Sequence, residues 1–368
     1  MFHSRKLQTV QASRGAAALL VFAFHLTYIG KDTFGVDVAK GVFRFGASGV
    51  DFFFVLSGFI IFFIHHDDIA KPGRLWPYVT KRLARVYPLY WVIALVLLPI
   101  YFSPLTTALS PTQYFVTLFK SFLLLPQPSN PMVTVAWTLS FEVFFYSMFA
   151  LAIYLSKPVS RIVVVFWLTF SLITYLDKMG LAGPLTFVSP ARVRVLEFVF
   201  SFYNLEFAMG CFVAFAATRF QIHHPGKLAL GAAAIFIIAG MLESFSSQKF
   251  LRVSGVAHYG VPAALFIFGA VSWEIRKAVA LPAALLFLGD ASYSIYLTHL
   301  PVLDLLSKLA LTLKDTNSLG PSFTVVIVLF VTIGAGLLCY HFVERPLLAL
   351  FHGRMFVNRR ATINPQVQ

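Results

Sequence analysis

Ten stretches of mostly apolar residues run along this chain, and each is long enough to cross a membrane as a helix. A transmembrane helix needs about 20 such residues, and no connecting segment is longer than about 30 residues. The sequence therefore predicts an all-α, polytopic membrane protein with a central cavity. The expected spans are residues 13–30, 46–64, 86–102, 133–155, 161–176, 196–217, 227–243, 254–272, 283–306 and 322–343.

The composition excludes several other classes of protein. Hydrophobic residues make up 58% of the 368 residues and charged residues 12%, whereas soluble domains have about 45–50% and about 25%. A soluble globule of this size could not cover so much apolar surface. Cys211 and Cys339 lie in apolar runs and are expected to be buried thiols. The net charge of +14 favours anionic membrane lipids or a phosphorylated cosubstrate as partners, rather than nucleic acid.

The basic residues predict the orientation in the membrane. They precede a first span that lacks a convincing cleavage site, so we expect a retained helix and a cytoplasmic N-terminus. Ten spans return the C-terminus to the cytoplasm, which places 18 of the 29 Lys and Arg residues on that side. We expect one transmembrane domain over 1–350, a basic cytoplasmic tail over 351–368 and no soluble hydrolase-like domain. Residues 112–125 are too short to span and predict an interfacial or re-entrant helix.

Arg14 and His25 are a pair of ionisable residues within the first expected span. They are 11 residues apart, which is about 20° from three full helical turns and about 16 Å along the axis. Both side chains should therefore lie on one helix face, with Arg14 near the cytoplasmic boundary and His25 near the middle of the membrane. Ionisable groups at that depth usually face a cavity or a partner. A snorkelling arginine and a packed histidine are the structural alternative.

Glu142 is expected about 14 Å inside the fourth span, at a depth similar to that of His25. A carboxylate commonly orients a working imidazole, so Glu142 is a candidate partner of His25. A purely structural ion pair is the alternative. Lys81, Arg82 and Arg85 form a basic group at the expected cytoplasmic end of the third span. Arginine forks suit phosphate oxygens, although the positive-inside rule alone would also explain these residues.

Two further segments contain polar residues within expected spans. Asp51 lies near the outer end of the second span and is a candidate substrate-binding residue, and Gly58, further along this span, permits close helix packing. Tyr293, Tyr296 and His299 recur every three residues along one stripe that could line a substrate cavity. Packing and helix capping would explain both segments equally. The tract His65-His66-Asp67-Asp68 lies in a short loop, and we expect no metal site there.

Six segments together resemble the integral-membrane acyltransferases of acyltransferase family 3. They occur in the family's order along the chain. They are Arg14 and His25 with ten residues between them, GVDFFFVLSGF at 49–59, KRLARVYPLYW at 81–91, AWTLSFEVFFY at 136–146, LGDASYSIYLTH at 288–299, and VERP at 343–346.

This resemblance implies an enzyme of the bacterial inner membrane. Such enzymes move an acyl group, often acetyl from cytoplasmic acetyl-CoA, to a hydroxyl of a cell-surface or exported polysaccharide or its lipid-linked precursor. By resemblance, Arg14, His25 and Glu142 would be catalytic, and Arg82 and Arg85, with Lys81, would hold the donor. His25 would act as general base, or it would carry the acyl group covalently. A transporter or flippase for a lipid-linked saccharide, or a membrane scaffold, are the alternatives from other classes.

Overall fold

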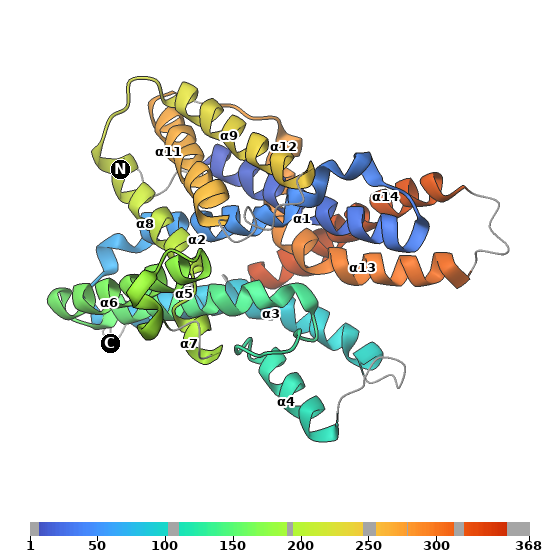
Figure 1. Cartoon of the computed structure of the whole chain (residues 1–368), viewed down its shortest axis with the longest axis horizontal. Coiled ribbons are helices and arrows are strands. Elements are labelled where there is room, and N and C mark those ends of the chain that lie inside the picture. The colour runs from blue at the N-terminus through green and yellow to red at the C-terminus, as the bar shows by residue number, and fades with distance from the viewer. Residues whose placement is uncertain are drawn as a thin grey trace, which may run out of the picture.

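The computed structural model describes residues 7–101, 110–189, 194–245, 255–277, 279–312 and 320–351, and these are all helix, turn or loop (Figure 1). The expected tail therefore lies outside the described residues, apart from its first residue. The α-helices are α1 Gln8–Phe34, α2 Gly49–His65, α3 Leu75–Tyr101, α4 Pro111–Phe122, α5 Trp137–Tyr154, α6 Lys157–Lys178, α7 Arg194–Val199, α8 Tyr203–Arg219, α9 Pro225–Phe245, α11 Val261–Arg276, α12 Ala283–Asp290, α13 Ser292–Thr312 and α14 Pro321–Cys339.

Short irregular helices connect several of these elements. The 3-10 helices are η1 Val38–Ser48, η2 His66–Asp68, η3 Pro72–Arg74, η4 Thr134–Ala136 and η5 Gly183–Val188, and the π-helices are η7 Val256–Gly260 and η8 Tyr340–Glu344. The two π-helices continue directly into regular helix, so the backbone hydrogen bonds remain largely satisfied within the apolar segments.

Nine segments of the described chain are long and apolar enough to cross a membrane, which makes this an integral membrane protein. They agree with nine of the ten expected spans. The remaining expected span, 283–306, is divided at Ala291 into α12 and α13. Its polar stripe, together with Asp304 and Lys308, explains why α13 does not reach the hydropathy of the other spans. The first half of α13, which carries this stripe, is buried inside the bundle, where other side chains can satisfy its polar groups, whereas Asp304 and Lys308 are exposed.

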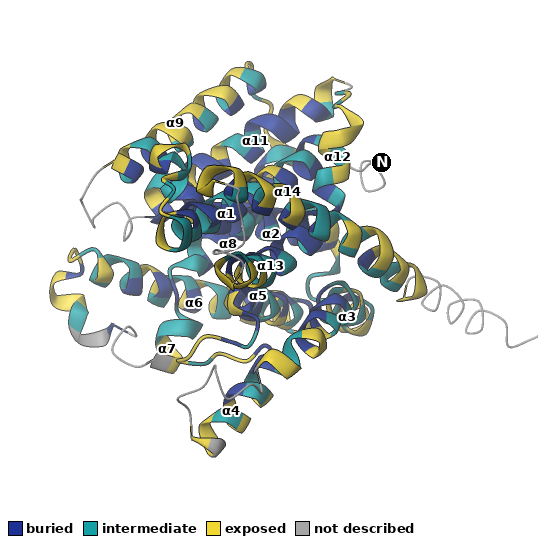
Figure 2. Ribbon diagram, turned by 90° about the vertical axis from the view of Figure 1, so that its right-hand side faces the viewer, coloured by how far each residue is buried: buried dark blue, intermediate teal, exposed yellow. Residues whose placement is uncertain are grey.

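The buried residues lie on the inward faces of the helices, around α1, α2 and α13 in the middle of the bundle, and the outward faces of the surrounding helices are exposed (Figure 2). On one side of α1 lie α9, α11 and α12, and on the other lie α3, α5 and α6 (Figures 1 and 2). α13 packs against both α1 and α14. Any cavity in the centre must therefore be lined by residues of α1, α2 and α13.

α2 and α8 cross so closely that glycine is required at the contact. A β-carbon at Gly58 would lie 2.0 Å from the carbonyl oxygen of Phe207, and one at Gly210 would lie 1.9 Å from that of Val55. Small residues at such crossings let two backbones meet, as is common in membrane bundles. The prediction of close helix packing at Gly58 is confirmed.

The first turn of α1 is fixed by a carboxylate from another helix. Glu274 of α11 accepts hydrogen bonds from the backbone N–H groups of Gln8 (2.6 Å) and Thr9 (2.8 Å) and from the Thr9 hydroxyl (2.6 Å). These donors have no partner within the helix, and a negative charge there also suits the helix dipole. Glu274 therefore positions the helix that carries Arg14 and His25.

α4 is a separate short helix that extends away from the bundle (Figure 1), so the prediction of a helix too short to span is confirmed. Phe115 and Phe119 of α4 are more than half exposed. The C-terminal end of α4 is tied to α3, because the indole of Trp91 donates to the Phe122 carbonyl (2.9 Å) and the Tyr90 hydroxyl donates to that of Ser121 (2.6 Å).

Candidate active site

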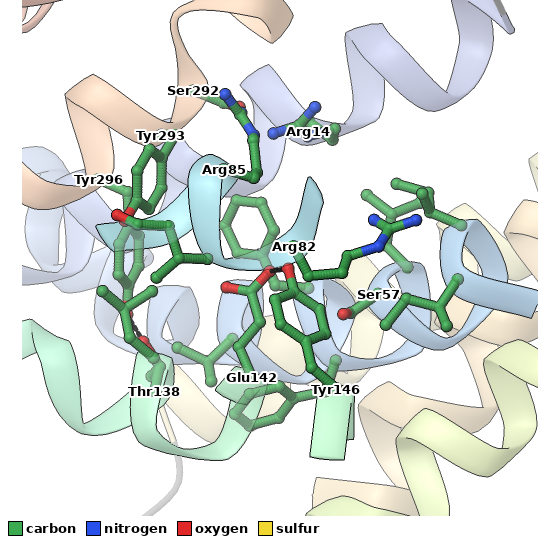
Figure 3. A pocket seen from close by; sticks show the side chains of 18 residues that line it. Arg14, Ser57, Arg82, Arg85, Thr138, Glu142, Tyr146, Ser292, Tyr293 and Tyr296 are labelled. Atoms are coloured by element: carbon green, nitrogen blue, oxygen red, sulfur yellow. Dashed lines mark hydrogen bonds between the residues drawn. The ribbon is translucent and has the colours of Figure 1, made fainter. Parts of the chain in front are cut away.

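Two cavities lie one after the other along the central helices. The first, the arginine cavity, has a volume of about 190 Å³ and is lined by Arg14, Val50, Phe53, Phe54, Leu56, Ser57, Ile60, Ile61, Arg82, Arg85, Val86, Thr138, Leu139, Glu142, Tyr146, Ser292, Tyr293 and Tyr296 (Figure 3). The second, the histidine cavity, has a volume of about 380 Å³ and is lined by Val21, Phe24, His25, Tyr28, Arg44, Phe45, Ala47, Ser48, Val50, Asp51, Thr134, Val135, Trp137, Phe202, Tyr203, Glu243, Gly255, Tyr259 and Tyr296.

The two cavities lie toward opposite ends of the same helices. On α1, Arg14 lines the arginine cavity, whereas residues between 21 and 28 line the histidine cavity. α2 follows α1 through η1. On α2, residues between 53 and 61 line the arginine cavity, and Asp51 lines the histidine cavity. Val50 and Tyr296 line both. The cavities therefore meet at these two side chains, deep in the bundle.

Arg85 is held in the arginine cavity by a buried ion pair. Its guanidinium lies 2.5 Å from the carboxylate of Glu344, which is 2% exposed and also accepts from the Ser294 hydroxyl at 2.6 Å. The guanidinium also lies over the ring of Tyr293, 5.2 Å from its centre. Because a buried, charged acceptor holds one nitrogen of the guanidinium and the Tyr293 ring lies against it, Arg85 has a defined orientation at the cavity wall.

Arg82 has a less complete set of partners. Its guanidinium lies 5.7 Å from the ring centre of Tyr78 and 5.8 Å from that of Tyr146. Its Nε atom is buried without a hydrogen-bond partner. A buried donor in this state is costly unless a ligand completes it, so Arg82 is the side chain of this cavity most in need of an anionic partner.

The arginine cavity has an excess of positive charge. Figure 3 shows Arg14 and Arg85 along one side, with Glu142 and Tyr146 across from them. Glu142 accepts a hydrogen bond from the Tyr146 hydroxyl. Within the described part of the chain, no carboxylate lies within ion-pairing distance of Arg14 or Arg82. With Glu344 committed to Arg85, the lone carboxylate of Glu142 faces two guanidinium groups, and the cavity is suited to an anionic group.

His25 lies in the other cavity, beside a second histidine. The Nδ1 atom of His25 lies 3.1 Å from Nε2 of His299 and 3.0 Å from the carbonyl oxygen of Val21. The two rings are 5.0 Å apart between centres, and the edge of the Phe24 ring is packed against His25. His25 is only partly buried and lines the histidine cavity.

Tyr296 forms the partition between the two cavities. Thr138 donates to the carbonyl of Val135 (2.9 Å), so its oxygen is free to accept from the Tyr296 hydroxyl at 2.9 Å. Phe53 contacts the ring of Tyr296 edge to face. The phenol is therefore held from both sides at the position where the two cavities meet.

The rest of the histidine cavity combines aromatic rings with charged groups. Asp51 and Glu243 are its carboxylates, and the latter accepts a hydrogen bond from the Tyr259 hydroxyl. Arg44 lies on the wall and forms an ion pair with Asp37 at 3.7 Å. Rings beside hydrogen-bonding groups are the typical surroundings of a bound polar ligand, and such a wall could hold a polyhydroxylated ring.

The structure divides the residues that the sequence singles out into three groups. The arginine cavity is lined by the donor-site and catalytic candidates Arg14, Arg82, Arg85 and Glu142, together with Tyr293. The histidine cavity is lined by His25 and Asp51. Tyr296 lines both cavities. Glu142 therefore lies in a different cavity from His25, whose imidazole neighbour is His299.

Two candidates lie outside both linings. His299 is fully buried behind His25, and Lys81 is exposed on α3 next to Arg82. Three further side chains of these sites, Glu344, Tyr146 and Glu243, have no expected role in the sequence. Glu344 could have been found, since it belongs to the VERP segment at 343–346.

Comparison with known proteins agrees with this arrangement. Residues 8–341 match the model of a family described as an acyltransferase domain. The chain belongs to acyltransferase family 3. A relative within this family is the exopolysaccharide production protein ExoZ of Rhizobium meliloti, strain 1021, which is 30% identical over 319 residues, covering 83% of this chain and 90% of ExoZ.

A second relative is named as an acyltransferase. The acyltransferase MdmB of Streptomyces mycarofaciens is 25% identical over 323 residues, covering 81% of this chain and 79% of MdmB. No solved structure shows a significant match to the chain. This family 3 member is thus a membrane acyltransferase, which favours the enzymatic prediction over a transporter or scaffold.

Proposed function

We propose that this protein transfers an acetyl group from cytoplasmic acetyl-CoA to a hydroxyl of an exported polysaccharide or its lipid-linked precursor, in a bacterial inner membrane. The single observation that carries the proposal is the contact between the two cavities at Val50 and Tyr296. One cavity has unpaired guanidinium groups and the other contains a histidine with an accessible nitrogen. Such a pair of sites is what a reaction between a phosphorylated donor and a neutral acceptor needs.

The arginine cavity suits the donor. A pocket that encloses a drug-sized ligand has about 300–1,000 Å³, so about 190 Å³ suits the narrow acyl-pantetheine arm rather than all of acetyl-CoA. The nucleotide would remain at the mouth of the cavity, where Lys81 is exposed one residue before Arg82. The incomplete hydrogen bonding of Arg82 supports a phosphate or thioester oxygen as its partner.

The histidine cavity suits the acceptor. It is about twice as large, and its wall offers tyrosine and tryptophan faces together with the carboxylates of Asp51 and Glu243. Carboxylates accept hydrogen bonds from sugar hydroxyls, and aromatic faces pack against sugar rings. The name of the relative ExoZ refers to exopolysaccharide production, which is why we choose an exported saccharide as the acceptor.

In the proposed reaction His25 is the general base. It takes the proton of the acceptor hydroxyl while the hydroxyl oxygen attacks the thioester carbonyl, so that a C–O bond forms and the C–S bond breaks. The proton then passes from the imidazolium to the leaving sulfur. Arg14 lies on the wall of the arginine cavity, about 16 Å from His25 along α1, and would hold the donor there. Tyr296 is buried where the cavities meet, and this burial would limit hydrolysis of the thioester.

A transfer assay with purified protein tests this proposal. Radiolabelled acetyl-CoA and the surface polysaccharide of the host cell are incubated with wild-type protein, His25→Gln, or His223→Gln, a control in an exposed loop. We expect label on the glycan with the wild type and His223→Gln, and a loss of about 10²- to 10⁴-fold with His25→Gln. Label that remains on the donor with the wild type would contradict the acyltransferase proposal, and full activity of His25→Gln would contradict the assignment of the base.

A further inference from the structure

The two imidazoles of His25 and His299 form a hydrogen-bonded pair between α1 and α13. His299 Nδ1 lies 2.7 Å from the carbonyl oxygen of Tyr296 and 3.2 Å from that of Ile295, and its Nε2 lies 3.1 Å from Nδ1 of His25. His25 Nδ1 also lies 3.0 Å from the carbonyl oxygen of Val21. The positions of three nitrogens and three carbonyl oxygens determine where the protons can be.

A carbonyl oxygen only accepts hydrogen bonds, so Nδ1 of His299 must carry its ring proton. In a neutral imidazole the other nitrogen is then an acceptor, and Nε2 of His299 presents its lone pair to His25. Both partners of His25 Nδ1 are thus acceptors, the Val21 carbonyl and the His299 nitrogen. His25 therefore carries its proton on Nδ1, and its Nε2 has the free lone pair that a base or nucleophile needs.

Burial separates the roles of the two rings. His299 is 0% exposed, lies against the edge of the Phe22 ring, and lines neither cavity. His25 is accessible from the histidine cavity. His299 can therefore act on a substrate only through His25. Residues that hold a functional histidine in one tautomer through its second nitrogen commonly affect function strongly.

We propose that His299 is a positioning residue that, together with the Val21 carbonyl, fixes the tautomer and ring orientation of His25, and that its second acceptor stabilises the protonated form of His25. The Nε2 lone pair of His299 accepts the Nδ1 proton of His25, so His25 can gain and lose a proton at Nε2 without turning. The catalytic part of this inference rests on the proposed function, whereas the pairing of the two rings does not.

Kinetics of His299→Phe and His299→Gln test the catalytic part. Phenylalanine keeps a ring but has no acceptor, whereas glutamine has a carbonyl oxygen that can accept from His25 and an amide that can donate to Tyr296. We expect His299→Phe to lower kcat by about 10- to 100-fold at an unchanged KM for acetyl-CoA, and His299→Gln to recover most of the loss. Equal activity of the two variants, or a loss confined to KM, would overturn the positioning role.

Chemical modification tests the pairing without any acyl transfer. Diethylpyrocarbonate reacts with an unprotonated imidazole nitrogen, and peptide mass spectrometry gives the rate at each histidine. Relative to exposed His223, we expect His25 to react in the wild type and in His299→Gln, and at least several-fold more slowly in His299→Phe. The same His25 rate in all three proteins would overturn the pairing. If the expected rates are found but the wild type transfers no acetyl, only the proposed function fails.

Discussion

Replacing Gly58 by alanine tests the close crossing of α2 and α8. The added β-carbon would lie 2.0 Å from the carbonyl oxygen of Phe207 and 2.8 Å from its carbonyl carbon. Close carbon–oxygen contacts between helices are about 3.3–3.6 Å, so the backbones must part locally by more than about 1 Å. An extra methyl in a packed core costs about 1–3 kcal/mol. Because the contact is with backbone, which cannot rotate away, we expect the upper end of this range.

The assay is thermal unfolding of the purified protein in detergent, with Gly231→Ala as the matched control. Gly231 is also within a helix, and a β-carbon there meets no atom within 4 Å. Alanine is a better helix former than glycine by up to about 1 kcal/mol, so the control should melt at or slightly above the wild-type temperature. Gly58→Ala should melt several degrees lower. Equal melting temperatures for the two variants would refute the argument from close packing.

Three further substitutions test the two cavities. Arg82→Ala should raise the KM for acetyl-CoA at least about tenfold, since a charge-assisted hydrogen bond contributes about 1.5–3 kcal/mol. Lys81→Ala, at an exposed position, should change this KM less, and equal effects of the two substitutions would contradict the donor site. Tyr296→Ala should join the two cavities and raise the rate of acetyl-CoA hydrolysis relative to acetyl transfer. The ratio of released thiol to labelled glycan measures this, and an unchanged ratio would contradict the separation of the cavities by Tyr296. Glu344→Gln should leave Arg85 without its counter-charge and lower the free energy of unfolding by up to about 3–5 kcal/mol. This would be measured as a lower melting temperature, and an unaltered melting temperature would contradict the buried ion pair.

Most of the fold could be predicted because transmembrane helices are encoded locally. Length and apolar composition alone predicted ten spans, nine of which agree with the structure, and the short helix predicted within 112–125 is found at Pro111–Phe122. The break at Ala291 was not predicted, since its cause is not local. α13 can carry a polar stripe because the other helices enclose it, and hydropathy along the chain does not report that environment.

The candidate site was predictable in part, for the same reason. Helical periodicity placed Arg14 and His25 on one face, and the structure shows that both line cavities, but different ones. The distance of about 16 Å between the two residues along the helix axis already indicated that their side chains are too far apart to line one small cavity. The pairings of Arg85 with Glu344 and of His25 with His299 join residues 259 and 274 positions apart. No spacing rule reaches that far, so these contacts required the folded chain.

The central claim is that donor and acceptor enter from opposite sides and react where the cavities meet. The most direct measurement uses proteoliposomes with the saccharide acceptor sealed inside and labelled acetyl-CoA, which cannot cross the bilayer, outside. We expect label on the enclosed saccharide, at a rate that falls with His25→Gln. Transfer only when both substrates are on the same side of the bilayer would contradict it.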